Sequence, residues 1–345
     1  MPNDQAIEGD YIRTKKNNLF FDVKGLLHPK DRIISFVRFY PDTTGERFRK
    51  GIHYKKIYDL SERYSFLKKN YPHYLFYSTQ LNMELQGVRR EEIERIYTPR
   101  GYLQNLIAKT KLSKIEQNAF DLCKLFIEKG DIPEQSIGIT GSQMVGLNKE
   151  DSDIDLIIYG TEVARDFQDK IPEIFKHDNN LRKYNFEEYK QHFRFRAAGA
   201  QISFNDFMKS EPRKNHQGKF GGIDFFIRYI KSPQDWKGTY YDYQILDLGT
   251  ISMLAEVIDA SDSLFTPCTY YINPVRILAS KAPVKNIEID DIRKITSYRG
   301  RFCEHAYAGE VFMVEGKLER VIFKNREIYY QIVLGTQKTD KMLLI

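Results

Sequence analysis

The chain has 345 residues, of which 41% are apolar and 29% charged, a composition typical of a globular protein with two or three domains. No apolar run approaches the roughly 20 residues needed to span a bilayer, and the amino terminus lacks a secretory apolar core. We therefore expect a cytoplasmic protein with no membrane partner. Cys123, Cys268 and Cys303 lie far apart, which argues against a disulfide framework or a structural zinc site.

The net charge of +6 is spread unevenly along the chain. Residues 1–112 hold 21 Lys and Arg against 13 Asp and Glu, so an anionic partner is expected to dock there. Within this region, residues 53–77 interleave basic side chains with tyrosines, as grooves for single-stranded nucleic acid do. Tyrosines at such spacing also fit a hydrophobic core in which the rings are buried and the hydroxyls reach water. A nucleic-acid groove and a structural core therefore both stay open.

The first region, residues 1–112, predicts a mixture of strands and helices. Residues 32–41 read as a strand that ends at Pro41, and a second strand follows a turn, near residues 51–60. Residues 90–97 and 101–109 are predicted to form short helices.

The second region, residues 113–235, begins with a helix that Ser113 and Glu116 start as a capping box. A short strand at 136–140, a Gly-Ser turn, a brief helix and a strand at 152–160 follow. The next predicted helix contains Pro172, a candidate for a kink or a break. An apolar strand at 221–230 carries a single aspartate.

From residue 236 the pattern is mostly that of β-strands separated by turn residues. The strand-like runs cover 269–278, 312–323, 326–335 and 341–345. A small barrel or sandwich is expected, and a five-stranded oligonucleotide-binding barrel is one option.

Three aspartates at alternate positions enter the strand at 152–160, namely Asp151, Asp153 and Asp155. Side chains two apart on a strand share a face and are about 6.6–6.8 Å apart along the backbone, so Asp153 and Asp155 should project together. Two such carboxylates bridge one Mg²⁺ or hold two ions. Because Mg²⁺ keeps water and binds substrate phosphate oxygens, the pair indicates a nucleotide substrate.

The Gly141-Ser142 pair comes just before these acids and predicts a phosphate site. Glycine lets a backbone approach phosphate closely, and the helix that opens at Ser142 presents free N–H donors. The Ser142 hydroxyl adds a further donor.

Gly-Ser, ten intervening residues and Asp-Ile-Asp-Leu resemble the signature of the DNA polymerase β-like nucleotidyltransferase superfamily. The resemblance implies that Asp153 and Asp155 bind the metals, that Gly141 and Ser142 hold the triphosphate, and that a later strand supplies a third carboxylate. Asp224 fits that place best and would help to activate the acceptor hydroxyl, with Asp206 as the competitor. Residues 28–41 and 297–321 are also similar to predicted archaeal nucleotidyltransferases.

The implied fold is α+β, with a polymerase β-like core of a small mixed sheet and helices. An N-terminal α+β region (1–112) and a C-terminal β-rich, barrel-like region (236–345) flank this core (113–235).

Basic residues near the acids are further candidates for the site. Arg213, Lys214 and Lys219 cluster in the loop before the Asp224 strand and either bind nucleotide or product phosphate or are simply solvated. Arg228 should share a face with Asp224, where it either steadies that carboxylate or reaches phosphate.

A calcium-binding EF-hand is the main rival for residues 151–162. It needs glycine at its sixth position, where this chain has Leu156. Asp151 is expected to be a surface residue or to support the site indirectly.

The sequence thus predicts an enzyme that uses two Mg²⁺ (or Mn²⁺) ions to transfer a nucleoside monophosphate from an NTP to an acceptor hydroxyl, with release of pyrophosphate. A nucleic-acid end, RNA above all, is the expected acceptor. A small molecule or a protein side chain as acceptor remains an alternative, as does a non-catalytic protein that binds nucleotide or nucleic acid.

Overall fold

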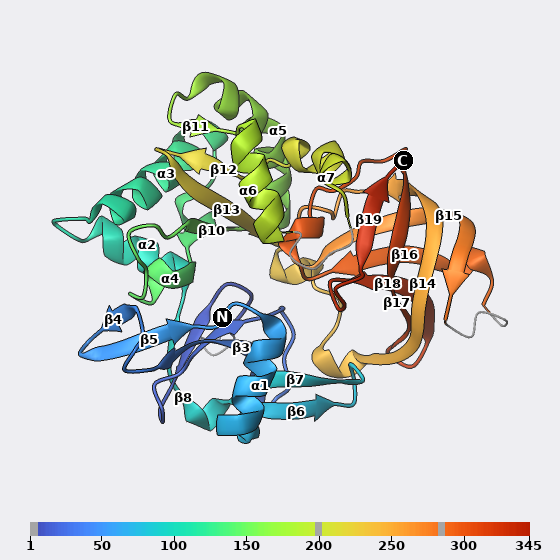
Figure 1. Ribbon diagram of the computed structural model, residues 1–345, viewed down its shortest axis with the longest axis horizontal. Helices are drawn as coiled ribbons and strands as arrows, with labels where there is room; N and C mark the ends of the chain where they lie inside the picture. Colours follow the sequence, from blue (N-terminus) through green and yellow to red (C-terminus); the bar gives the residue numbers. More distant parts are fainter. Residues whose placement is uncertain (1–5, 197–201, 282–286) are drawn as a thin grey trace. The chain divides into compact units, whose positions relative to one another are not determined.

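The computed structural model describes residues 6–196, 202–281 and 287–345 (Figure 1). The fold is α+β, with helices and three β-sheets. The chain divides into two compact units, and neither is one continuous segment. The first unit contains 1–78, 83–182 and 218–240, and the second contains 79–82, 183–217 and 241–345. None of the helices in the described ranges is long and apolar enough to cross a bilayer.

The first unit opens with an eight-stranded sheet. Its main path runs β4-β5-β3-β2-β1-β8, and β7 joins β3 to β6. The strands are β1 (Tyr11–Thr14), β2 (Phe20–Val23), β3 (Arg32–Pro41), β4 (Arg47–Arg49), β5 (Ile52–Lys56), β6 (Leu75–Ser78), β7 (Met83–Arg89) and β8 (Ile93–Tyr97). The strands predicted at 32–41 and near 51–60 are confirmed.

Alternation along these strands, with a register shift that separates Val37 from Phe39 on β3, gives the sheet two apolar faces. One face packs against helix α1 (Leu60–Asn70), where Phe21 and Val37 meet Leu67. The opposite face carries Phe20 and Phe39, which pack with the segment that follows the Gly-Ser turn. The members of this second cluster are Tyr11, Phe20, Phe39, Tyr54, Tyr97, Met144, Val145 and Leu147. The N-terminal sheet therefore lies directly over the signature motif.

The prediction of a helix at residues 90–97 is wrong. Residues Arg90–Glu92 form one 3₁₀ turn, and Ile93–Tyr97 form β8, which pairs with β1. Glutamate and arginine favour a helix locally, but pairing of Tyr11 with Tyr97 along the edge of the sheet overrides that preference.

A second, five-stranded mixed sheet follows in the order β11-β12-β13-β10-β9. Its strands are β9 (Ile137–Ile139), β10 (Ile154–Tyr159), β11 (Leu181–Arg182), β12 (Gln217–Phe220) and β13 (Ile223–Ile230). Strand β10 pairs parallel with β13 and antiparallel with β9. The associated helices are α2 (Pro99–Ile107), α3 (Lys114–Gly130), α4 (Gly141–Met144) and α5 (Thr161–His177). The capping box of Ser113 and Glu116 is confirmed, and α5 continues through Pro172.

The second unit contains helices α6 (Phe186–Arg196) and α7 (Phe204–Ser210) and a sheet that closes on itself. Five strands pair in the ring β14-β15-β16-β18-β17, which β14 closes by pairing with β17, and β19 adds to β17. These strands are β14 (Tyr243–Asp259), β15 (Cys268–Ser280), β16 (Ile292–Ser297), β17 (Val311–Phe323), β18 (Glu327–Leu334) and β19 (Lys341–Leu344). The β-rich, barrel-like C-terminal region is thus present.

The buried environment of His28 indicates that the first unit loses stability in acid. Its Nε2 lies 2.8 Å from the Ala6 carbonyl, and its Nδ1 accepts from the Ile34 N–H at 3.2 Å, so the ring is held neutral. Burial, and then the nearby Arg90 charge, lower the pKa of His28 to about 4. The folded state therefore resists protonation, and stability present above the unfolded pKa of about 6.5 is lost as pH falls towards 4.

We expect this loss to reach about 2–3 kcal/mol between pH 7.5 and 4.5. Trp236 is the one tryptophan of the sequence and belongs to the first unit, so its fluorescence during urea unfolding reports on that unit. His28→Gln should flatten the pH dependence, whereas His53→Gln, at an exposed histidine of the same sheet, should not. Equal slopes in wild type and His28→Gln would contradict the prediction.

Candidate functional site

Asp155 and Gly141 meet at the centre of the first unit's mixed sheet. Asp155 is the second residue of β10, and its carbonyl accepts the Thr140 N–H at 2.9 Å, which fixes the Gly-Ser turn beside the strand. Gly141 has a φ of +75°, and a Cβ at this position would stand 2.2 Å from Asp155 Oδ2. Only glycine therefore lets the backbone pass against this carboxylate. The predicted association of the turn with Asp155 is present.

Asp153 completes the predicted acid pair. It directly precedes β10 and is exposed, whereas Asp155 is partly buried. Burial, and after it the charge of Asp153, raise the pKa of Asp155 to about 6, against the opposing effects of Arg228, Lys56 and Arg38. Two carboxylates close enough to oppose each other's ionisation form a site that a cation would stabilise.

Ser142 and Gln143 form the rest of the turn. Both are almost fully buried, and the Gln143 amide donates to the Asp153 carbonyl at 3.4 Å. The Ser142 carbonyl accepts the Leu147 N–H at 2.9 Å. Within the described ranges, the Ser142 hydroxyl has no side-chain partner and is free to donate to a ligand.

Arg228 lies on the face of the sheet that carries Asp155. Its guanidinium pairs with Glu8 at 2.6 Å, and Glu8 also accepts from Lys24 at 3.1 Å. Glu8, Asp22 and Asp155 together raise the pKa of Arg228 above its usual value, despite burial. The prediction had placed Arg228 beside Asp224 or phosphate. In the structure its carboxylate partner is Glu8 of the N-terminal segment, and Asp155 lies within its field.

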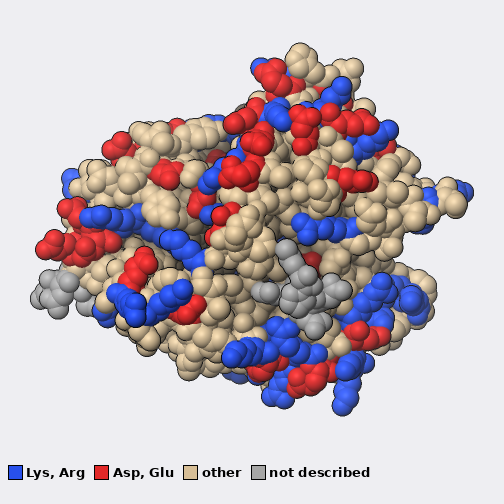
Figure 2. Space-filling view, turned by 180° about the vertical axis from the view of Figure 1, so that it is seen from behind, with Lys and Arg blue, Asp and Glu red and all other residues tan. Residues whose placement is uncertain are grey.

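The N-terminal sheet adds cations that the sequence did not place near the acids. Arg38 of β3 and Lys56 of β5 both act on the pKa of Asp155, and Arg47 of β4 donates to the Leu147 carbonyl. Figure 2 shows Lys and Arg side chains gathered at the lower right, over the part of the view where this sheet lies. The excess of basic residues in 1–112 was the one sequence signal for them.

Asp224 stands apart from the acid pair in its contacts. Asp224 is the second residue of β13, and because Ile154 pairs with Phe225 it lies level with Asp153, which directly precedes β10. Its side chain is 54% exposed and pairs with Lys219 at 2.7 Å. In the part of the chain that the structure describes, no three His, Cys, Asp or Glu side chains gather closely enough to hold a metal ion.

The other predicted residues belong to the second unit and are held there by its own side chains. Lys214 is fully buried, pairs with Glu211 at 2.7 Å and donates to the Arg301 carbonyl at 2.5 Å. Arg213 forms a fork with Glu310. These contacts leave Lys214 no exposed charge with which to bind phosphate. The sequence could not show this, because burial of the loop depends on packing within the second unit.

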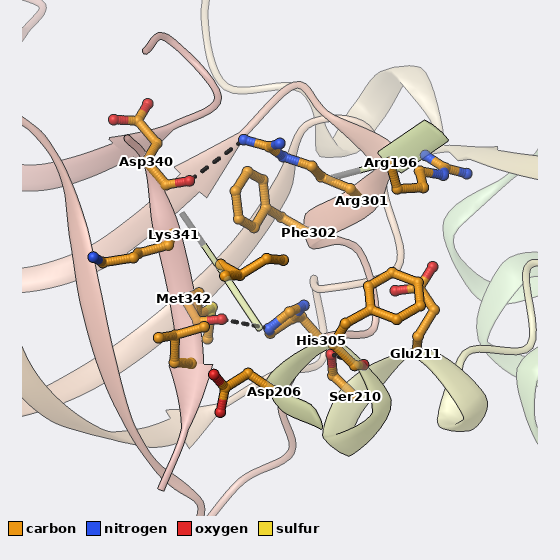
Figure 3. A pocket seen from close by; sticks show the side chains of 13 residues that line it. Arg196, Asp206, Ser210, Glu211, Arg301, Phe302, His305, Asp340, Lys341 and Met342 are labelled. Atoms are coloured by element: carbon orange, nitrogen blue, oxygen red, sulfur yellow. Dashed lines mark hydrogen bonds between the residues drawn. The ribbon is translucent and has the colours of Figure 1, made fainter. Parts of the chain in front are cut away.

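Asp206, the competitor for the third acid, lies on helix α7 and not on a strand. Its carboxylate accepts from the Ser203 hydroxyl at 2.7 Å, as part of the helix cap. It lines a pocket of the second unit together with Arg196, Arg301 and His305 (Figure 3). His305 Nε2 is 2.7 Å from the Met342 carbonyl in that pocket. The acids Asp153 and Asp155 are not among its lining residues.

The acid pair partly fits a divalent ion. Asp153 and Asp155 supply hard oxygen ligands, and Gly141 leaves open the space that a side chain would fill. Asp224, the third carboxylate that the resemblance implies, pairs with Lys219. Two protein carboxylates are nevertheless a usual number for Mg²⁺, which takes its other ligands from water and substrate phosphate.

Comparison with known proteins finds a similar sequence but indicates no function. The chain is 25% identical over 337 residues to the uncharacterised protein MJ1086 of Methanocaldococcus jannaschii, and the match covers 95% of each chain. No protein-family model and no solved structure matches the sequence.

Proposed function

We propose that this protein is a Mg²⁺-dependent nucleotidyltransferase that moves a nucleoside monophosphate from an NTP to an acceptor hydroxyl. The observation that carries the proposal is the packing of Gly141 against the Asp155 carboxylate, with Asp153 beside it. A Gly-Ser turn and an Asp-x-Asp strand on one small mixed sheet match the arrangement that the superfamily resemblance implies.

Each part of the site has a role in this reaction. Asp153 and Asp155 would hold the metal ions, which neutralise charge on the phosphates during displacement. The turn at Gly141 and the free Ser142 hydroxyl would bind the triphosphate. The acceptor oxygen forms a bond to the α-phosphorus, the bond to the bridging oxygen breaks, and pyrophosphate leaves. Asp224 is the proposed group near the acceptor proton, provided that Lys219 releases it.

The acceptor is proposed to be an RNA end because the basic N-terminal sheet lies over the site. The Phe20 and Phe39 face of that sheet packs on the segment after the turn, so its cations border the acids. Attraction of phosphate by such a surface falls steeply with added salt.

A non-catalytic nucleotide-binding protein is the second candidate. The ion pair of Asp224 with Lys219, and the lack of a three-acid group in the described ranges, favour it. Turnover separates the two: wild-type protein is incubated with each labelled NTP, Mg²⁺ and either short RNAs, small hydroxyl compounds or the protein alone. Pyrophosphate release with label transfer supports the enzyme. Nucleotide binding without release, across all acceptors, supports the binding protein.

A further inference from the structure

Three cations of the N-terminal sheet surround the exposed ring of Tyr58. Lys56 Nζ lies 4.8 Å and the Arg38 guanidinium carbon 5.6 Å from the ring centroid, and Arg47 reaches the Tyr58 hydroxyl at 3.5 Å. Tyr58 itself is 60% exposed. We call Arg38, Arg47, Lys56 and Tyr58 the Tyr58 patch.

The cations of this patch lack carboxylate partners. Arg38 donates to the Ile57 carbonyl at 3.1 Å and Arg47 to the Leu147 carbonyl, but within the described ranges none of the three forms an ion pair. Their neighbours on the same strands differ, since Lys55 pairs with Asp42 at 3.2 Å. Partly buried charges without partners are costly, and a bound counterion would offset that cost.

The acid pair lies within the field of this patch without neutralising it. Asp153 and Asp155 both act on the pKa of Lys56, yet burial and the repulsion of Arg38 and Arg47 still lower that pKa to about 8. Acids and cations are thus close enough to interact but not paired. A metal-bound polyphosphate resolves both imbalances, because the metal pairs with the acids and the phosphate oxygens pair with the cations.

We propose that the Tyr58 patch binds the phosphate chain of the nucleotide, with Arg38 and Lys56 in contact with its oxygens. The inference rests on the proposed function, which places a triphosphate at Gly141 and Asp155. The Tyr58 ring contacts both cations and holds them in position, and Arg47 contacts the Tyr58 hydroxyl. Recognition here is of phosphate and is independent of the base, so inorganic tripolyphosphate should bind as the nucleotide's chain does.

The test is calorimetric titration of wild-type protein at pH 7.5 with tripolyphosphate and Mg²⁺, and with a non-hydrolysable ATP analogue and Mg²⁺. Lys56→Gln should weaken both ligands about 10–100-fold, because one charge-assisted hydrogen bond contributes roughly 1.5–3 kcal/mol. Lys55→Gln, one residue away on the other face of the strand, should stay within about twofold of wild type. Lys56→Arg should restore most of the affinity, which a merely structural loss would not allow.

The outcomes separate this inference from the proposed function. Unchanged affinities in Lys56→Gln and Arg38→Gln would overturn the inference and leave nucleotidyl transfer at the acid pair standing. Lys56-dependent binding of tripolyphosphate without pyrophosphate release from any NTP would sustain the inference and reject the transferase. No binding of either ligand by wild type at millimolar concentration would reject the patch as a phosphate site.

Discussion

Asp153→Asn and Asp155→Asn are each expected to lower Mg²⁺-dependent pyrophosphate release by about 1,000-fold or more. Metal ions stabilise developing charge by several kcal/mol, and each 1.36 kcal/mol corresponds to a factor of ten in rate. Asp153 and Asp155 are close enough to affect each other's ionisation, and in the described ranges no third acid completes a group with them, so one amide should suffice to abolish metal binding.

The control is Asp151→Asn, which removes the same charge from an exposed aspartate two residues before the pair. It should retain activity. Asp155→Asn should also keep or raise the thermal midpoint without Mg²⁺, because Asp155 is partly buried beside a like charge. A midpoint that falls together with activity would mean that Asp155 supports the fold and would argue against a metal role.

Gly141→Ala is expected to have the second-largest effect. Alanine disfavours the φ of +75°, and its Cβ would collide with Asp155 Oδ2, so the turn or the carboxylate has to move. We expect a stability loss of about 1–3 kcal/mol and a fall in activity of about 100-fold or more. Urea unfolding followed by Trp236 fluorescence and a pyrophosphate-release assay measure the two effects.

Gly51→Ala is the control that separates backbone strain at a positive φ from displacement of the Asp155 carboxylate. Gly51 has a φ of +82°, but a Cβ there would meet nothing within 4 Å. It should show the backbone penalty alone, with activity close to that of wild type. If Gly141→Ala lost no more activity than Gly51→Ala, the close approach of Gly141 to Asp155 would have no functional meaning.

Local patterns predicted much of the fold and, in the candidate site, the closeness of Gly141 to Asp155. The strand at 32–41, the capped helix that starts after Ser113 and the strand that carries Asp155 have strong local signals, and all are present. Residues 90–97 failed because edge pairing with β1 outweighed helix preference. Strand β14 was missed, since its partly exposed residues alternate weakly at the start.

The site was predictable only where its residues are close in sequence. Helix α4 and one loop connect Gly141 to Asp155, so spacing sufficed to place them together. Arg38 and Lys56 come from a sheet whose contact with the motif depends on the burial of aromatic side chains, and Glu8 comes from the segment before that sheet, so spacing does not reveal them. Conversely, Arg213 and Lys214 are near Asp224 in sequence but form ion pairs with Glu310 and Glu211 inside the second unit.

The two units alternate along the chain, so the residues of the candidate site are not all made at the same stage of synthesis. Strand β10 carries Asp155, but its parallel neighbour β13 carries Arg228 and leaves the ribosome only after residues 183–217 have been made for the other unit. A nascent chain that ends before β13 therefore has its acids without the arginine beside them. A fragment of residues 113–235 alone would likewise lack Glu8 of the N-terminal segment and the sheet that supplies Arg38 and Lys56.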